Sequence, residues 1–148
     1  MKFSVSPIEE SPGFIAHHTD MLMRLGLIRA FKMKGYNITP EQWGVLGCLW
    51  GEEGINQREL AEKASKDRPN VTRILNLLEK NELIKRVPHP NDKRSVRVYL
   101  TKLGKNLQKE LTPIVINFIE ECFKNVPEQK YKDFIAVHRQ IAQNLKSL

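Results

Sequence analysis

The sequence predicts a mainly α-helical domain with one small β-hairpin, an α+β fold. Apolar residues recur at helical spacing through most of the 148 residues. A short helical segment that begins near residue 56 is followed, after a brief break, by a longer one over 68–81, which is the arrangement of a helix-turn-helix. Residues 95–100 then alternate apolar and polar side chains, which indicates a half-buried strand.

The composition fits one globular domain, with 41% apolar and 28% charged residues. No apolar run approaches the roughly 18 residues of a membrane span, and the start, MKFSVSPIEESPG, lacks the apolar core of a signal peptide. Cys48 and Cys122 are too few for a disulfide framework. We therefore expect a cytoplasmic protein with no membrane partner.

The net charge of +7 is concentrated in the middle of the chain. Residues 55–101 hold 11 Lys and Arg against 6 Asp and Glu, whereas residues 1–54 hold 5 against 6. A basic segment of this kind indicates a polyanionic partner, with nucleic acid the first candidate.

Two helices are predicted before the basic segment. The first covers residues 12–33 and is stopped by Gly35. Thr39 can cap the second, which ends near Gly51, and Gln42 three residues later completes a capping box.

Within the basic segment, Asn56 can cap the short helix and Asp67 the longer one, after a break at Ser65-Lys66. The longer helix carries a clean apolar stripe, formed by Val71, Ile74, Leu75 and Leu78.

A hairpin follows the longer helix, with a weaker strand over 84–88, a turn at 90–92 and the strand over 95–100. A lone hairpin is marginal in water, so it must pack on the preceding helices. The helix pair and the hairpin together predict a winged helix-turn-helix over residues 37–101.

Two long helices are predicted after the hairpin, one capped by Thr101 and one starting near Pro127. The last helix has an apolar or amphipathic seam at intervals of 3 and 4, typical of helices packed lengthwise: Tyr131, Phe134, His138, Ile141, Leu145 and Leu148. One small domain has few partners for such a seam. We therefore expect a homodimer, with residues 1–36 and 102–148 as the dimerisation region.

The outward face of helix 68–81 suits DNA. Arg and Asn side chains make the best bidentate matches to guanine and adenine in the major groove, and Thr72 with the free amides of the first turn suits phosphate. The alternative is a solvated helix face, but such a face usually carries Lys and Glu.

The hairpin would place Lys93 and Arg94 at its tip, where cations can enter the adjacent minor groove. Asp92 could pair with the Arg94 guanidinium and hold its direction. The predicted DNA-binding residues are Gln57, Arg58, Lys66, Arg68, Pro69, Asn70, Thr72, Arg73, Asn76, Lys93, Arg94 and Arg97.

The stretches RPNVTRILNLLEKNELI and DKRSVRVYLTKLG, within a match over roughly residues 39–105, resemble the MarR family of transcriptional regulators. The sequence departs from the family pattern at Lys93, where arginine is frequent, and at Asn81-Glu82, which replaces a glycine after the recognition helix. The resemblance implies a homodimer that binds a palindromic operator, usually as a repressor. It also implies that Asn70, Thr72 and Arg73 contact the major groove and Arg94 the minor groove.

Regulators of this kind often release DNA when a small aromatic or anionic effector binds between their two regions. His18, Met21, Trp43 and Trp50 could line such a crevice, and Arg24 or Arg29 could receive an anion. Core packing and surface positions explain these residues equally well. We expect no cofactor, and the histidines and acids form no convincing metal site.

Three alternatives remain beside a DNA-binding repressor. A winged-helix module could bind other proteins, although its outward helix face is polar rather than apolar. A regulator could sense oxidation through Cys48 or Cys122, although both cysteines fall on apolar helical faces, where a thiol behaves as a small hydrophobe. An enzyme is not supported, because no phosphate loop or nucleophile motif is present.

Overall fold

The computed structural model describes residues 7–64 and 66–148, apart from the side chain of Lys93. It confirms a mainly α fold with a small sheet. After a short 3₁₀ turn, Ile8–Glu10, the elements are α1 (Pro12–Met33), α2 (Pro40–Gly51), β1 (Ile55–Asn56), α3 (Gln57–Lys63), α4 (Arg68–Lys80), β2 (Ile84–His89), β3 (Asp92–Leu100), α5 (Lys102–Cys122) and α6 (Glu128–Lys146).

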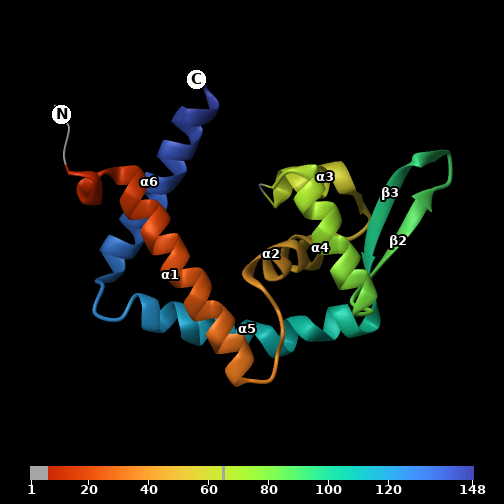
Figure 1. The fold of residues 1–148 in the computed structure, drawn as a ribbon, viewed down its shortest axis with the longest axis horizontal. Coiled ribbons are helices and arrows are strands. Elements are labelled where there is room, and N and C mark those ends of the chain that lie inside the picture. Colours follow the sequence, from red (N-terminus) through yellow and green to blue (C-terminus); the bar gives the residue numbers. More distant parts are fainter. Residues whose placement is uncertain (1–6, 65) are drawn as a thin grey trace.

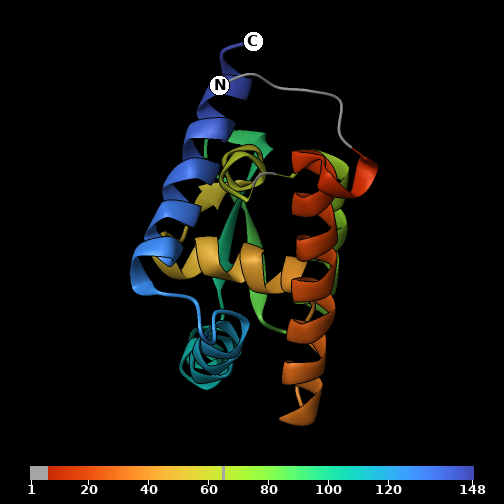
Figure 2. The same cartoon turned by 90° about the vertical axis from the view of Figure 1, so that its left-hand side faces the viewer.

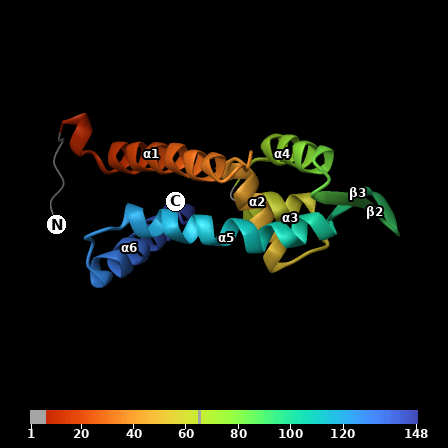
Figure 3. The ribbon, with the colours of Figure 1, turned by 90° about the horizontal axis from the view of Figure 1, so that it is seen from below.

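The longest axis of the molecule follows α5, as Figure 1 shows. Helices α2, α3 and α4 and the hairpin lie beside the first half of α5, whereas α1 and α6 lie beside its second half (Figures 1 and 3). In the end-on view of Figure 2, α1 and α6 stand on opposite sides of the end of α5. The hairpin and α6 therefore occupy opposite ends of the molecule.

Side chains at the predicted positions cap the helices. Thr39 accepts from the Gln42 amide at 3.1 Å and Gln42 accepts from the Thr39 amide at 3.0 Å, which completes the capping box. Each remaining predicted cap likewise accepts the backbone amide three residues later, and these caps are Asn56, Asp67 and Thr101. Such caps satisfy amides that the first turn leaves unpaired.

The sheet has three antiparallel strands in the order β1-β3-β2. The hairpin pairs Ile84 with Leu100 and runs to His89 opposite Asp92, with an irregular register between Pro88 and His89. Strand β1 was not predicted, because two residues carry no readable alternation. It pairs Ile55 with Val98 and so fastens the base of the hairpin to the segment before α3.

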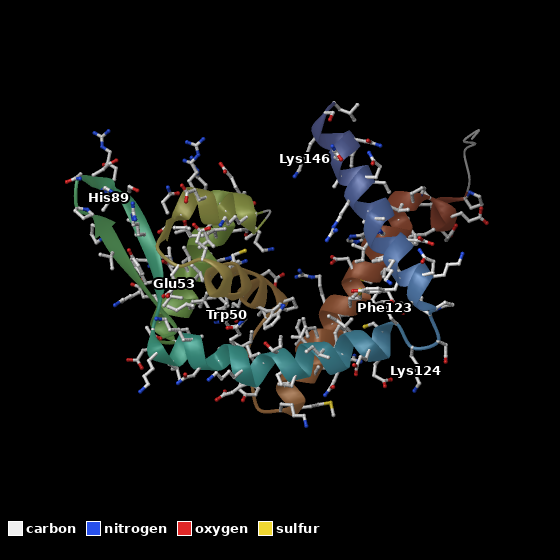
Figure 4. The ribbon with its side chains drawn as sticks, turned by 180° about the vertical axis from the view of Figure 1, so that it is seen from behind. Trp50, Glu53, His89, Phe123, Lys124 and Lys146 are labelled. Atoms are coloured by element: carbon white, nitrogen blue, oxygen red, sulfur yellow. The ribbon has the colours of Figure 1, made fainter. Side chains whose placement is uncertain are left out.

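The core lies between α2, α3, α4, the sheet and the first half of α5, and it also receives Leu27 and Phe31 from α1. Leu60, Leu75, Leu78 and Val98 are completely buried in it. Trp50 lies between α2 and α5 in Figure 4. This core fixes α4 and the hairpin relative to each other.

Helix α6 contributes no buried residue to this core. Its contacts at the end of α5 are aromatic: the Phe123 ring lies 4.8 Å from Tyr131 and 5.7 Å from Phe134, and Figure 4 shows Phe123 next to α6. The Nδ1 of His138 lies 2.8 Å from the Phe134 carbonyl oxygen of the same helix.

Apolar side chains remain exposed on the helices at this end. They are Phe14, Ile15, Leu22 and Leu25 on α1, Ile116 and Ile119 on α5, and Tyr131, Phe134, Val137, Ile141 and Leu145 on α6. We call this set the apolar end face. A single chain leaves it open to water, which is unfavourable in proportion to its area.

Candidate nucleic-acid interface

Helix α4 divides into a buried and an exposed face, as predicted. Val71 and Leu75 are completely buried, whereas Arg73 and Asn76 are exposed. The exposed face is hollowed, and the hollow is lined by Arg68, Pro69, Thr72, Arg73, Asn76 and Leu77. Five of the predicted DNA-binding residues thus share one surface.

A groove of about 520 Å³ separates α4 from the hairpin. It is lined by Asn56, Gln57 and Arg58 at the start of α3, by Arg68 and Thr72 of α4, and by Asp92, Arg94, Ser95 and Val96 of β3. Arg68 and Thr72 belong to both the hollow and the groove. The structure therefore brings α3, α4 and the hairpin arginine onto one continuous concave surface, which we call the polar groove.

Asn56, Ser95 and Val96 line the polar groove but were not among the predicted residues. Asn56 was assigned only to capping, a role that does engage its side chain. Their place follows from the pairing of β1 with β3, which has no signal in the sequence.

The hairpin tip differs in detail from the prediction. Asp92 accepts a hydrogen bond of 2.9 Å from the backbone amide of Arg94, rather than holding its guanidinium. A short acidic side chain that bonds the amide two residues on stabilises a turn. Asp92 therefore shapes the tip and leaves the Arg94 side chain exposed. The predicted contact of Lys93 lies outside the described side chains.

Arg86 of strand β2 is engaged with α4. Its Nε donates to Glu79 at 2.8 Å and its Nη2 donates to the Oδ1 of Asn76, also at 2.8 Å. These two bonds join strand β2 to helix α4.

Three predicted residues with described side chains are outside the lining of the polar groove. Asn70 is exposed and bonds to the N-cap residue Asp67, and Lys66 precedes that cap. Arg97 lies apart from the groove, in a depression of the hairpin with Val87 and Tyr99.

Two polar contacts join α1 and the segment after it to the rest of the chain. Arg24 of α1 pairs with Glu41 of α2, and the Tyr36 hydroxyl donates to Glu110 of α5 at 2.9 Å. Partial burial raises the pKa of Glu41, but its own backbone amide and the Arg24 guanidinium outweigh that effect, so the pKa lies below its usual value.

The four residues predicted to bind an effector do not meet in one pocket. His18 stacks on Phe14 at 5.9 Å on the exposed part of α1, where Met21 is also exposed. Trp43 and Trp50 pack against each other at 5.1 Å beside the core. Their role in binding an effector stays a prediction.

The cysteines differ from each other in exposure. Cys48 is half-buried, whereas Cys122 is exposed beside the apolar end face, contrary to the buried position expected from its helical stripe. Burial raises the pKa of both thiols, although Lys63 partly offsets this at Cys48. Since the thiolate is the reactive form, neither thiol is activated.

Among residues 7–64 and 66–148, no group of three or more His, Cys, Asp or Glu side chains could hold a metal ion. No helix in the same ranges is long and apolar enough to cross a membrane.

Comparisons with known proteins identify the family. Residues 38–96 match the model of the MarR family. The HTH-type transcriptional regulator FarR of Neisseria gonorrhoeae is 33% identical over 114 residues, which cover 75% of this chain and 78% of FarR. The chain belongs to the MarR family of transcriptional regulators.

Solved structures agree with the fold of this MarR regulator. PcaV of Streptomyces coelicolor, in complex with its natural ligand, has a TM-score of 0.85 at 20% identity, covering 95% of this chain and 98% of PcaV. The transcriptional repressor CouR, bound to a 23-mer DNA duplex, has a TM-score of 0.84 at 22% identity, covering 96% of this chain and 99% of CouR. The structure of this chain thus has the fold of these winged helix-turn-helix regulators.

Proposed function

We propose that this MarR regulator is a homodimeric repressor of a palindromic operator, with α4 in the major groove and the hairpin tip in the adjacent minor groove. The observation that carries the proposal is the polar groove, which joins the exposed face of α4 to Arg94. Two-fold symmetry would set the two half-sites about 34 Å apart.

Residue chemistry supports distinct roles on this surface. We assign base contacts to Arg73 and Asn70 and a minor-groove contact to Arg94. Gln57, Arg58, Lys66, Arg68, Thr72 and Arg97 would serve the phosphates, which strengthens binding and its dependence on salt.

The apolar end face supports the dimer. It gathers exposed apolar residues from α1, α5 and α6, and a second copy would remove them from water. We therefore assign dimerisation to residues 1–36 and 102–148 and DNA binding to residues 37–101. Phe134 and Leu22 also border an apolar hollow of about 290 Å³ within this face.

A small aromatic or anionic effector would release the operator, a proposal supported by the ligand-bound state of the similar protein PcaV. The raised pKa of both cysteines favours this mode over oxidation. Because its relatives are transcriptional regulators, we also propose that the protein acts in the cytoplasm and catalyses no reaction.

Single substitutions in the full-length chain test the DNA contacts. Genomic fragments retained by the purified protein would first supply the operator. Arg73→Ala should weaken operator binding by about 1–3 kcal/mol, with the loss concentrated at one base position. Arg94→Ala should weaken binding while sedimentation shows an intact dimer. Parental affinity in both variants at moderate salt would refute the assignment of these contacts.

A further inference from the structure

The two asparagines on the exposed side of α4 are each bonded within the protein, and by opposite ends of their amide groups. Asn70 donates from Nδ2 to the Oδ2 of Asp67 at 2.7 Å. Asn76 instead accepts at Oδ1 from the Nη2 of Arg86 at 2.8 Å. The contrast matters because an amide can offer DNA either a donor or an acceptor.

The chemistry of each partner fixes the direction of the amide. A carboxylate only accepts hydrogen bonds, so the group of Asn70 that faces Asp67 must be its NH₂. A guanidinium only donates, so the group of Asn76 that faces Arg86 must be its carbonyl oxygen. Neither amide can turn over without losing its bond.

Further bonds hold both partners in place. The other oxygen of Asp67 accepts the Asn70 backbone amide at 2.9 Å, and this bond first, then the side-chain bond, lowers the pKa of Asp67 and keeps it ionised. The Nε of Arg86 donates to Glu79 at 2.8 Å. The partner of each asparagine is therefore itself held in place, Asp67 by its bond to the Asn70 backbone amide and Arg86 by its ion pair with Glu79.

We infer that Asp67 and Arg86 are positioning residues that set the exposed asparagines of α4 in opposite senses, so that the end of the amide left unbonded for DNA is Oδ1 in Asn70 and Nδ2 in Asn76. The inference rests on the proposed entry of α4 into the major groove. Within the described part of the chain, the opposite end of each amide, Asn70 Oδ1 and Asn76 Nδ2, has no hydrogen-bond partner.

The inference concerns the direction in which Asn70 presents its amide to a base. An unrestrained asparagine reads adenine with its donor and its acceptor together. With one Nδ2 hydrogen held by Asp67, Asn70 keeps Oδ1 and one Nδ2 hydrogen for DNA, and the fixed direction of the amide favours bases that present an exocyclic amine to Oδ1, namely adenine and cytosine. Asn76 donates to guanine, to the O4 of thymine, to the N7 of adenine or to a phosphate oxygen, all of which are acceptors.

Substitutions at Asp67 test the direction of Asn70, with half-sites selected from a randomised duplex library by the full-length protein. Asp67→Asn keeps an oxygen for the cap but replaces the second oxygen with an amine, which turns Asn70 over. Its preferred base at the Asn70 position should change from adenine or cytosine to guanine or thymine, by about tenfold.

Asp67→Ser is the matched control, because it removes the same charge and retains a cap but has no group to orient Asn70. It should relax the preference without reversing it. Asn70→Ala identifies the base position concerned. A half-site for Asp67→Asn that equals the parental one would overturn the inference for Asn70.

A second pair of variants tests Asn76. The double variant Glu79→Gln/Arg86→Met frees the Asn76 amide at unchanged net charge, whereas Glu79→Gln alone keeps the bond from Arg86. The double variant should bind several-fold more weakly than the parent, which carries the same net charge. The loss falls on one base position if Asn76 meets a base, and equally on all sequences if it meets a phosphate. Equal binding by the double variant and the parent would overturn the inference for Asn76.

Arg73→Ala in the same selection separates this inference from the proposed function. If the parent protein selects no half-site, the proposed function is wrong. If the parent selects one and Arg73→Ala loses it, while the Asp67 and Arg86 variants behave like the parent, only the orientation of the asparagines is wrong.

Discussion

The indole Nε1 of Trp50 donates a hydrogen bond of 2.9 Å to the backbone carbonyl oxygen of Gly104. This bond joins α2 to the first turn of α5. At the same junction the backbone of Leu83, which follows α4, lies so close that a Cβ on Gly104 would stand 2.0 Å from its carbonyl oxygen. Helix α2, helix α5 and the segment between α4 and β2 thus meet at one glycine.

Gly104→Ala should therefore destabilise the protein by at least the 1–3 kcal/mol that is typical of overpacking. The clash is with backbone, so no side chain can rotate away from it. Gly47→Ala in α2 is the control, since nothing lies within 4 Å of its added Cβ, and it should stabilise by about 0.5–1 kcal/mol. Urea unfolding at a fixed protein concentration measures both, and equal midpoints would contradict the close approach.

Glu82 has a φ of 60°, in the left-handed region that glycine tolerates and other residues adopt at a cost. Glu82→Gly should stabilise the protein by about 1 kcal/mol. Lys80→Gly, two residues earlier within α4, should instead destabilise it by a similar amount. A destabilised Glu82→Gly variant in the same unfolding assay would contradict the strain at this position.

The pair between Arg24 and Glu41 should make stability depend on pH. The pKa of Glu41 lies below its usual value, so its carboxylate stabilises the fold at neutral pH and this contribution is lost as the pH falls through the folded-state pKa. Glu41→Gln should be less stable than the parent by about 0.5–1 kcal/mol at pH 7. The difference should shrink as the pH falls through the folded-state pKa, below the usual pKa of a glutamate. Glu120→Gln, at an exposed site on α5, is the control.

The apolar end face should not tolerate charge. Ile141→Asp should produce a monomer at concentrations where the parent is dimeric, because a carboxylate would be buried without a partner. Gln143→Asp adds the same group to another side of α6 and should leave the dimer intact. Sedimentation velocity measures the oligomeric state of both variants. A dimeric Ile141→Asp variant would show that Ile141 is not part of the dimer interface.

Arg58 lies in the polar groove with a weak partner, since its Nε is 3.4 Å from Glu62 and both side chains are exposed. Arg58→Ala should weaken binding to all sequences alike and reduce the slope of log K against log salt by about 0.9. Arg29→Ala on α1 removes the same charge away from the groove and should change the slope little. Fluorescence anisotropy over a salt series measures both.

The sequence predicted the helices well because their ends carry explicit signals. Thr39 with Gln42, and Asp67 before Pro69, mark helix starts with side chains whose bonds are local. The buried stripe of α4 was predicted for the same reason, since the period of a helix is visible within a dozen residues.

Features that depend on distant segments could not be predicted. The bond between Arg86 and Asn76 spans ten residues and two elements, and β1 pairs with a strand more than forty residues away. The left-handed Glu82 is a further case, because glycine normally marks such a site. The hydrogen-bond partners of the Asp92 and Asn70 side chains were not predicted either. Each depends on which atom of a short side chain comes within reach of a donor or an acceptor.

Helix α5 runs without interruption from its cap at Thr101, beside the hairpin, to Cys122, beside the apolar end face. Its 21 residues span roughly 30 Å at about 1.5 Å per residue. A helix of that length converts a tilt of about 5° at one end into a displacement of about 2.6 Å at the other, most of the roughly 3.4 Å rise of one base pair. Small changes of angle at the dimer interface would therefore be enough to change whether the α4 helices of the two copies have the spacing of successive major grooves.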